Sequence, residues 1–164
     1  WMESVGEGVP GYVTPKVAIG AIVGNEEGKI LLVQRKDSGV WLYPTGWADV
    51  GYSPAEVAMK EVEEETGIIA EPLQLLGVVD GMRMGFSRFG MYMLLFHLRA
   101  TGGELQGHPL ETGDVGWFGP DELPTPTAGA QWWGDMAFAA IAGDVNPATF
   151  DAPREHMWRG DHTN

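Results

Sequence analysis

The sequence predicts an α/β domain in which helices pack on the faces of a β-sheet. The main observation is the order of the patterns, because apolar strand-like stretches precede, flank and follow one strong helical stretch. The chain has 164 residues, of which 44% are hydrophobic and 20% charged, and this suits one domain with a core of its own. An α+β arrangement would have the same order of elements.

The elements can be placed in order along the chain. Residues 1–15 contain several glycines and prolines and predict an irregular lead-in. Strands are predicted at 16–24 and 29–35, joined by a turn, with a short extended piece at 41–43, a loop at 45–52, and further strands at 73–79, 92–100 and 114–118. Residues 80–90 predict a loop, 101–103 a turn, 120–124 one helical turn, and 131–142 a second helix. We expect the domain to occupy residues 16–143 and the tail, 144–164, to be poorly ordered.

The strongest helix prediction covers residues 54–65. Ser53 is a good N-cap, Pro54 suits the first helical position, and Glu56 completes a capping box with Ser53. Gly67 lies where a C-terminal cap is expected. At about 100° per residue, the core face is predicted to consist of Ala55, Ala58, Met59 and Val62.

Three carboxylates form a separate sector of this helix. Glu61, Glu64 and Glu65 are spaced so that they stack on one patch, where like charges repel by a few tenths of a kcal/mol per pair. The C-terminal half of a helix also disfavours negative charge. A divalent cation would remove both costs, because Mg²⁺ and Ca²⁺ prefer carboxylate oxygens. A solvated acidic face is the alternative, and the spacing alone leaves both open.

Composition excludes several classes of function. With 10 basic and 23 acidic residues, the net charge is −13, which disfavours nonspecific binding to nucleic acids or anionic membranes. The chain has no cysteine and therefore no disulfide, thiolate zinc site or cysteine nucleophile. No apolar run approaches the roughly 18 residues of a membrane span, and no signal-peptide pattern is visible, so we expect a cytoplasmic protein.

Residues 46–68 carry a longer motif, which reads Gly-Trp-Ala-Asp-Val-Gly-Tyr-Ser-Pro-Ala-Glu-Val-Ala-Met-Lys-Glu-Val-Glu-Glu-Glu-Thr-Gly-Ile. This resembles the Nudix box of the Nudix hydrolase superfamily, and the positions in register are Gly46, Glu61, Val62, Glu64, Glu65, Gly67 and Ile68. Tyr52 stands where the box has a glutamate, and Lys60 where it has an arginine. The resemblance extends over about residues 16–142 and implies an α/β/α sandwich with a mixed sheet flanked by helices.

The resemblance implies the hydrolysis of the pyrophosphate linkage of a nucleoside diphosphate derivative. Such substrates include ADP-ribose, nucleotide sugars and CDP-alcohols. It implies that Glu61, Glu64 and Glu65 bind Mg²⁺ or Mn²⁺, with a backbone carbonyl of Thr45 or Gly46 as a further ligand. One of the box carboxylates, such as Glu61 or Glu64, or Glu111 on a later loop, would act as the base.

The substrate-binding candidates are Arg35, Arg83 and Arg88 for the phosphates and Trp47 for stacking on a base. Surface salt bridges are the alternative role for each arginine. Two further functions stay open: hydrolysis of oxidised nucleoside triphosphates, and a ligand-sensing module whose box has lost activity at Tyr52 and Lys60. The aromatic residues would permit a homodimer.

Overall fold

The computed structural model describes residues 14–153. Residues 1–13 of the lead-in predicted for 1–15, and residues 154–164 of the predicted tail, lie outside this range. The described residues form eight strands and two helices, in the order β1 (Lys16–Gly24), β2 (Ile30–Arg35), β3 (Trp41–Leu42), β4 (Thr45–Trp47), α2 (Pro54–Thr66), β5 (Ile68–Asp80), β6 (Met91–Gly103), β7 (Thr112–Phe118), α3 (Ala130–Ile141) and β8 (Thr149–Phe150).

All eight strands join one mixed sheet in the order β3-β2-β1-β6-β5-β8, with β4 paired to β1 and β7 paired to β2. Strand β1 runs parallel to β6 along its whole length. Its other edge carries β4 and the start of β2, both antiparallel. The mixed sheet predicted from the sequence is therefore confirmed, with β1 near its centre.

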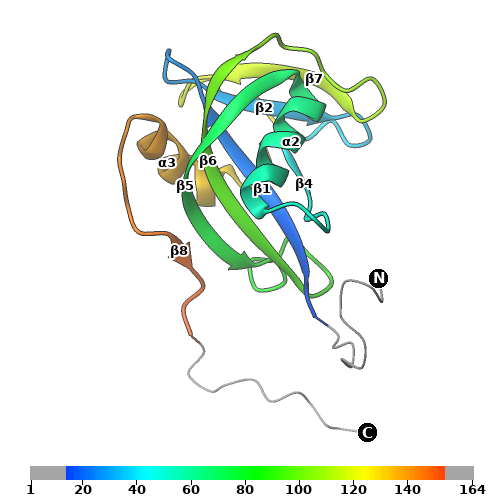
Figure 1. Cartoon of the computed structure of the whole chain (residues 1–164), viewed down its shortest axis with the longest axis vertical. Coiled ribbons are helices and arrows are strands. Elements are labelled where there is room, and N and C mark those ends of the chain that lie inside the picture. The colour runs from blue at the N-terminus through cyan, green and yellow to red at the C-terminus, as the bar shows by residue number, and fades with distance from the viewer. Residues whose placement is uncertain (1–13, 154–164) are drawn as a thin grey trace, which may run out of the picture.

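The two helices cover opposite faces of this sheet (Figure 1). On one face, Ile19, Ala21 and Val23 of β1 pack with the buried side chains of α2. On the other face, Ile22 of β1 belongs to the cluster that contains Trp133 of α3. Because both faces are covered, β1 is apolar and buried from Ala18 to Gly24. The predicted sandwich of helices around a sheet is confirmed.

Helix α2 buries a different face from the one predicted. Val57, Ala58, Val62 and Thr66 are its buried residues, whereas Met59 is 38% exposed. Including Val57 in place of Met59 turns the buried arc towards the side that carries Glu61 and Glu65, and both of these side chains are half-buried. Glu61 and Glu65 thus face the protein on the side of the helix that contacts strand β4, whereas Glu64 is exposed.

Several predicted boundaries were wrong. Residues 45–47 form β4 instead of a loop, 101–103 continue β6 instead of turning, and residues 120–124 are a turn rather than helical. Strand β5 begins at Ile68, well before the predicted residue 73, because β5 and β6 pair along their length across three register shifts. Such shifts break the alternation of apolar and polar residues that marks a strand.

The first part of the tail is built into the sheet, contrary to the prediction. Strand β8 pairs in parallel with Gly77 and Val78 of β5. The Asp151 carboxylate then accepts a hydrogen bond of 2.6 Å from the backbone N–H of Asp80. The sequence pattern misses this strand because it has only two residues and both are exposed.

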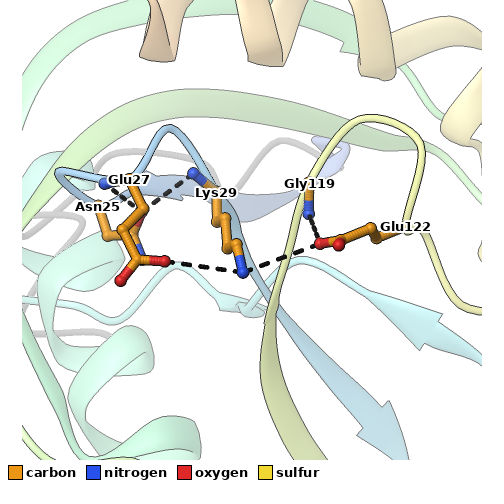
Figure 2. Close-up of polar contacts among 5 residues, drawn as sticks. All are labelled: Asn25, Glu27, Lys29, Gly119 and Glu122. Carbon is orange, nitrogen blue, oxygen red and sulfur yellow. Dashed lines mark hydrogen bonds and ion pairs between the residues drawn. The ribbon is translucent and has the colours of Figure 1, made fainter.

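The turn between β1 and β2 is tied to the loop that follows β7 (Figure 2). Asn25 Oδ1 accepts hydrogen bonds from the backbone N–H groups of Glu27 and Lys29, each 3.0 Å long. Lys29 Nζ lies 3.6 Å from Glu27 and 3.8 Å from Glu122, whose carboxylate also accepts from Gly119 N–H. These contacts join one end of β2 to one end of β7, and the opposite ends carry the site described next.

Among the described residues, neither helix is long and apolar enough to cross a membrane.

Candidate active site

A cavity of about 390 Å³ opens between the end of β2, the start of β4, the end of α2 and the loop before β7. Its charged lining residues are Arg35, Lys36, Asp37, Glu65 and Glu111. Two of the predicted carboxylates and one predicted arginine therefore meet in one place, although they come from three separate parts of the chain.

Glu65 is the most constrained of these carboxylates. Its Oε2 accepts a hydrogen bond of 3.1 Å from the backbone N–H of Thr45, at the start of β4. Burial raises the pKa of Glu65 to about 7, and the nearby carboxylates Glu61 and Glu111 raise it further, while the Thr45 hydrogen bond opposes the rise. The fold therefore holds the Glu65 carboxylate in place, and the nearby positive charge of Arg35 does not offset the effects that raise its pKa.

Glu61 lies against the backbone of Gly46. A Cβ atom built on Gly46 would overlap the carboxylate of Glu61, so only glycine leaves room for this group beside β4. Partial burial raises the pKa of Glu61, and the charges of Glu64, Asp49 and Glu111 add to the rise. The first glycine of the box is thus in direct contact with a box carboxylate.

Glu64 is exposed and pairs with Lys60. Lys60 Nζ lies 3.5 Å from Glu64 and 2.9 Å from Asp49, and the Asp49 hydrogen bond raises the pKa of Lys60. The Lys60 ammonium also lies 6.0 Å from the centre of the Tyr52 ring. The two residues that depart from the box therefore contact each other, and Lys60 still pairs with a box carboxylate.

Within residues 14–153, no three acidic or histidine side chains lie close enough together to enclose a metal ion as they stand. Glu64 is turned towards Lys60, whereas Glu61 and Glu65 face β4. The donor set nevertheless fits a hard divalent cation, because all three groups offer carboxylate oxygens from adjacent turns of one helix.

Glu111 is exposed on the loop that precedes β7, and hydrogen bonds fix this loop to α2. The backbone N–H groups of Gln106 and His108 donate to the carbonyls of Thr66 and Glu65, at 2.8 and 3.3 Å. The Glu111 carbonyl accepts from Lys36 N–H at 3.0 Å, and Lys36 Nζ donates to the Pro109 carbonyl at 3.0 Å. These bonds cap the end of α2 and hold Glu111 at the wall of the cavity.

Arg35 is one of two basic residues that line this cavity, and the other is Lys36. Its guanidinium donates two hydrogen bonds to Asp37, of 3.1 and 2.8 Å, and this pairing lowers the pKa of Asp37 to about 2. The hydrogen bonds to Asp37 are also the main cause of the raised pKa of Arg35, and the charges of Glu65 and Glu111 add to the rise. Arg35 thus balances part of the negative charge around the cavity.

The other predicted substrate-binding residues lie elsewhere. The Trp47 ring packs against Phe89, with ring centres 6.0 Å apart, and Lys16 Nζ lies over both rings. Arg83 donates a hydrogen bond of 2.8 Å to the Ala152 carbonyl, and Arg88 is exposed on the same loop. None of the three lines the charged cavity.

Sequence reasoning missed the roles of Asp49 and Lys36. The Asp49 carboxylate accepts a hydrogen bond from Lys60, which lies 11 residues away in the sequence. Lys36 donates a hydrogen bond to Pro109, 73 residues away, on the loop that carries Glu111. No local pattern marks either residue, because each contact depends on how distant segments pack.

Comparison with known proteins identifies the family. Residues 14–137 match the model of the NUDIX domain. A Bacillus subtilis protein named "Putative ADP-ribose pyrophosphatase YjhB" is 36% identical over 121 residues, which are 72% of this chain and 57% of that relative. The chain therefore spans little more than half the length of this curated relative.

Two solved structures support the same assignment. An ADP-ribose pyrophosphatase from Streptococcus suis is 31% identical and superposes with a TM-score of 0.71, over 84% of this chain and 100% of that one. A UDP-X diphosphatase is 28% identical with a TM-score of 0.73, over 88% of this chain and 70% of that one. The match of the family model, the shared fold and the carboxylates beside Gly46 agree, and the chain belongs to the Nudix family.

Proposed function

We propose that the protein hydrolyses the diphosphate linkage of a nucleoside diphosphate derivative and that it requires a divalent cation, Mg²⁺ or Mn²⁺. The observation that carries this proposal is the arrangement at the start of β4, where Glu61 packs on Gly46 and Glu65 bonds to Thr45 beside the charged cavity. Nudix hydrolases generally use divalent metals. Glu61, Glu64 and Glu65 would hold the cation, with a backbone carbonyl of Thr45 or Gly46.

A cation bound there would neutralise diphosphate charge and lower the pKa of a bound water. The residues of the chain have three tasks around it. Glu61 and Glu65 are kept in position by contacts with β4. Lys60 limits the repulsion among the acids by pairing with Glu64. Arg35 lines the cavity and is placed to bind the substrate's phosphate oxygens, in exchange for part of its pairing with Asp37.

Glu111 is the base that we favour. It lines the cavity, its backbone is fixed by Lys36, and its charge raises the pKa of both Glu61 and Glu65. In the reaction, the oxygen of water forms a bond to one phosphorus and the bridging P–O bond breaks. The proton that leaves the water passes to the Glu111 carboxylate, and the two products are phosphate monoesters.

The substrate class rests on the same geometry and on the relatives. The names of similar proteins specify ADP-ribose and UDP-linked diphosphates as their substrates. We therefore place this chain's substrate among diphosphates that join a nucleoside to a second group, such as ADP-ribose, nucleotide sugars or CDP-alcohols.

The test is release of phosphate monoesters from a panel of these compounds and of nucleoside triphosphates. Each compound is incubated with protein and Mg²⁺, with or without EDTA, and the products are detected with phosphatase and a phosphate assay. We expect EDTA-sensitive turnover of a diphosphate-linked compound. If only nucleoside triphosphates are hydrolysed, the substrate is a nucleoside triphosphate and not a diphosphate-linked compound. If no compound of the panel is hydrolysed and one compound raises the melting temperature, the protein is a ligand-sensing module and not a hydrolase.

A matched pair of variants tests the residues. Glu64→Gln is expected to lower turnover by at least about 100-fold, because it removes a charged ligand of the cation. Glu63→Gln changes an exposed neighbour on the other side of the helix and should leave turnover within about twofold of the unmodified protein. Equal losses in the two variants would contradict the metal site. Glu111→Gln should lower kcat without changing the Mg²⁺ concentration needed for half-maximal turnover.

A further inference from the structure

The chain returns to the sheet after α3. Residues 144–152 lead from the end of α3 to the outer edge of β5, and we call this segment the strap (Figure 1). The match to the NUDIX domain model ends at residue 137, so the strap lies outside the part of the chain that the family model covers. Membership of the family therefore does not account for the contacts of the strap.

Side-chain and backbone contacts fix the strap to β5. Gln74 Nε2 donates a hydrogen bond of 3.1 Å to the Asp144 carbonyl. Thr149 pairs with Gly77, and its hydroxyl donates to the Leu76 carbonyl at 3.2 Å. A Cβ atom built on Gly77 would lie 2.5 Å from the Thr149 hydroxyl oxygen, so a glycine in β5 leaves the room that the strap needs.

Beyond β8, the strap contacts the start of the loop between β5 and β6, residues 81–90. The Asp151 carboxylate accepts its 2.6 Å hydrogen bond from the backbone N–H of Asp80, the last residue of β5. Arg83 Nη2 donates a hydrogen bond of 2.8 Å to the Ala152 carbonyl. Two consecutive residues of the strap therefore hold the point where the chain leaves the sheet and enters the loop.

The same loop forms part of the wall of a second cavity, of about 400 Å³. This cavity shares Leu42 and Thr45 with the charged cavity, and residues 84–86 of the loop line it. These wall residues follow Arg83 directly in the chain. A substrate group that extends from the carboxylates into the second cavity would thus contact residues whose position depends on the strap.

The loop has few other anchors near this wall. The hydrogen bonds from Met84 N–H to the Asp80 carbonyl and from Phe86 N–H to the Gly81 carbonyl shape its turns without reaching another element of the fold. Phe86 packs on Trp132, with ring centres 6.4 Å apart, but is still 44% exposed. A loop with few buried contacts opens at a small cost in free energy, so each anchor at its base raises the fraction of time that its wall residues are in place.

We propose that the strap holds the loop 81–90 in the arrangement that binds substrate, and that Asp151 and Arg83 are positioning residues for substrate binding. This inference rests on the proposed function. Neither residue lines either cavity, so each acts through the loop and not by touching the substrate. In this proposal, the guanidinium of Arg83 holds the loop instead of binding phosphate.

The first measurement is hydrogen–deuterium exchange of the loop, which requires no ligand. Asp151→Ala removes the acceptor for the Asp80 N–H, whereas Asp151→Asn keeps an oxygen acceptor on a side chain of the same size. We expect faster exchange of residues 81–87 in Asp151→Ala and Arg83→Met, and a smaller change in Asp151→Asn. Arg88→Met is the matched control, because it removes the same charge from an exposed position on the same loop that lines neither cavity.

The second measurement is binding without hydrolysis. In the α,β-methylene analogues of ADP-ribose and UDP-glucose, a CH₂ group replaces the bridging oxygen of the diphosphate. Their dissociation constants are measured by isothermal titration calorimetry in Mg²⁺. We expect Asp151→Ala and Arg83→Met to bind the preferred analogue about threefold to tenfold more weakly, because the loop is in place for a smaller fraction of the time. Asp151→Asn and Arg88→Met should stay within about twofold of the unmodified protein.

Turnover separates positioning from a general loss of structure. With a compound that the protein hydrolyses, Asp151→Ala should raise KM by about the same threefold to tenfold and leave kcat within about twofold. The Mg²⁺ concentration for half-maximal turnover should not change, because the strap does not contact the carboxylates of α2. Damage to the fold as a whole would lower kcat as well, and a fall in kcat with unchanged KM would contradict the proposal.

Two further results would overturn the proposal. One is unchanged exchange of the loop in both Asp151→Ala and Arg83→Met, and the other is faster exchange with unchanged affinity for the analogues. Failure of this inference differs from failure of the proposed function. EDTA-sensitive hydrolysis with unchanged affinity in the variants rejects only the role of the strap. Weaker binding in the variants, when the unmodified protein hydrolyses nothing, rejects only the reaction. If the unmodified protein binds neither analogue, both proposals are wrong.

Discussion

Gly46 shows how one missing side chain shapes the site. The carboxylate of Glu61 occupies the space that a Cβ at this position would need. Gly46→Ala should therefore displace Glu61 and lower Mg²⁺-dependent turnover by at least about tenfold, while the fold is kept because alanine suits a strand conformation here. Gly102→Ala is the control, because nothing lies within 4 Å of its Cβ position. Equal activity of both variants would mean that the Glu61 contact does not matter.

Glu65 gives the metal-free protein a pH-dependent stability. Its pKa is raised to about 7 in the fold, chiefly by burial, so the folded state holds the proton more tightly than the unfolded chain. The free energy of unfolding should therefore fall as the pH rises from about 4.5 to 7, with Glu65 contributing on the order of 2 kcal/mol. Urea unfolding in EDTA at pH 5 and pH 8 measures this fall.

The contribution of Glu65 is isolated by comparison with Glu65→Gln. This variant should gain stability relative to the unmodified protein as the pH rises from 5 to 8, because it has no carboxylate to ionise. Glu63→Gln, at an exposed position, should show no such relative gain. A constant difference between Glu65→Gln and the unmodified protein across this range would show that Glu65 is ionised at both pH values.

At the scale of elements, α2 was the easiest part to predict and its orientation the hardest. The capping box at Ser53 and Glu56 is present as predicted, and Gly67 adopts the left-handed conformation of a C-cap, with φ of 72°. Both are local signals. Which side of the helix is buried depends on its contact with β4, a three-residue strand containing a glycine that has too little pattern to be recognised.

The corrected face of α2 predicts a difference between two neighbouring positions. Val57→Ala removes two methyl groups from a fully buried site and should lower the free energy of unfolding by about 1–3 kcal/mol. Met59→Ala, at a position 38% exposed, should change it by less than about 0.5 kcal/mol. Urea denaturation of both variants measures the difference, and the reverse order would restore the face predicted from the sequence.

At the scale of the whole molecule, the local sequence predicted which side chains have functional groups. The residues that these side chains contact became known only from the structure. The carboxylates of α2, Gly46 and Glu111 were identified from spacing and resemblance, and Arg35 as one of few basic residues; the structure places them around the start of β4 and the charged cavity. Arg83 was identified as another of these basic residues and Trp47 by its position after the box glycine, and contacts with Ala152 and Phe89 hold them away from this cavity. The sequence alone therefore does not show which distant segment each side chain contacts.

The central position of β1 has a consequence for hydrogen exchange. Its backbone is paired on one edge with β6 and on the other with β4 and β2, and both of its faces are covered by helices. The amide protons of Ile19 to Val23 should therefore be among the last to exchange with deuterium, on the timescale of global unfolding. Loops such as residues 81–90 should exchange far earlier. The carboxylates of α2 would then be carried by a helix that packs on the slowest-exchanging part of the chain.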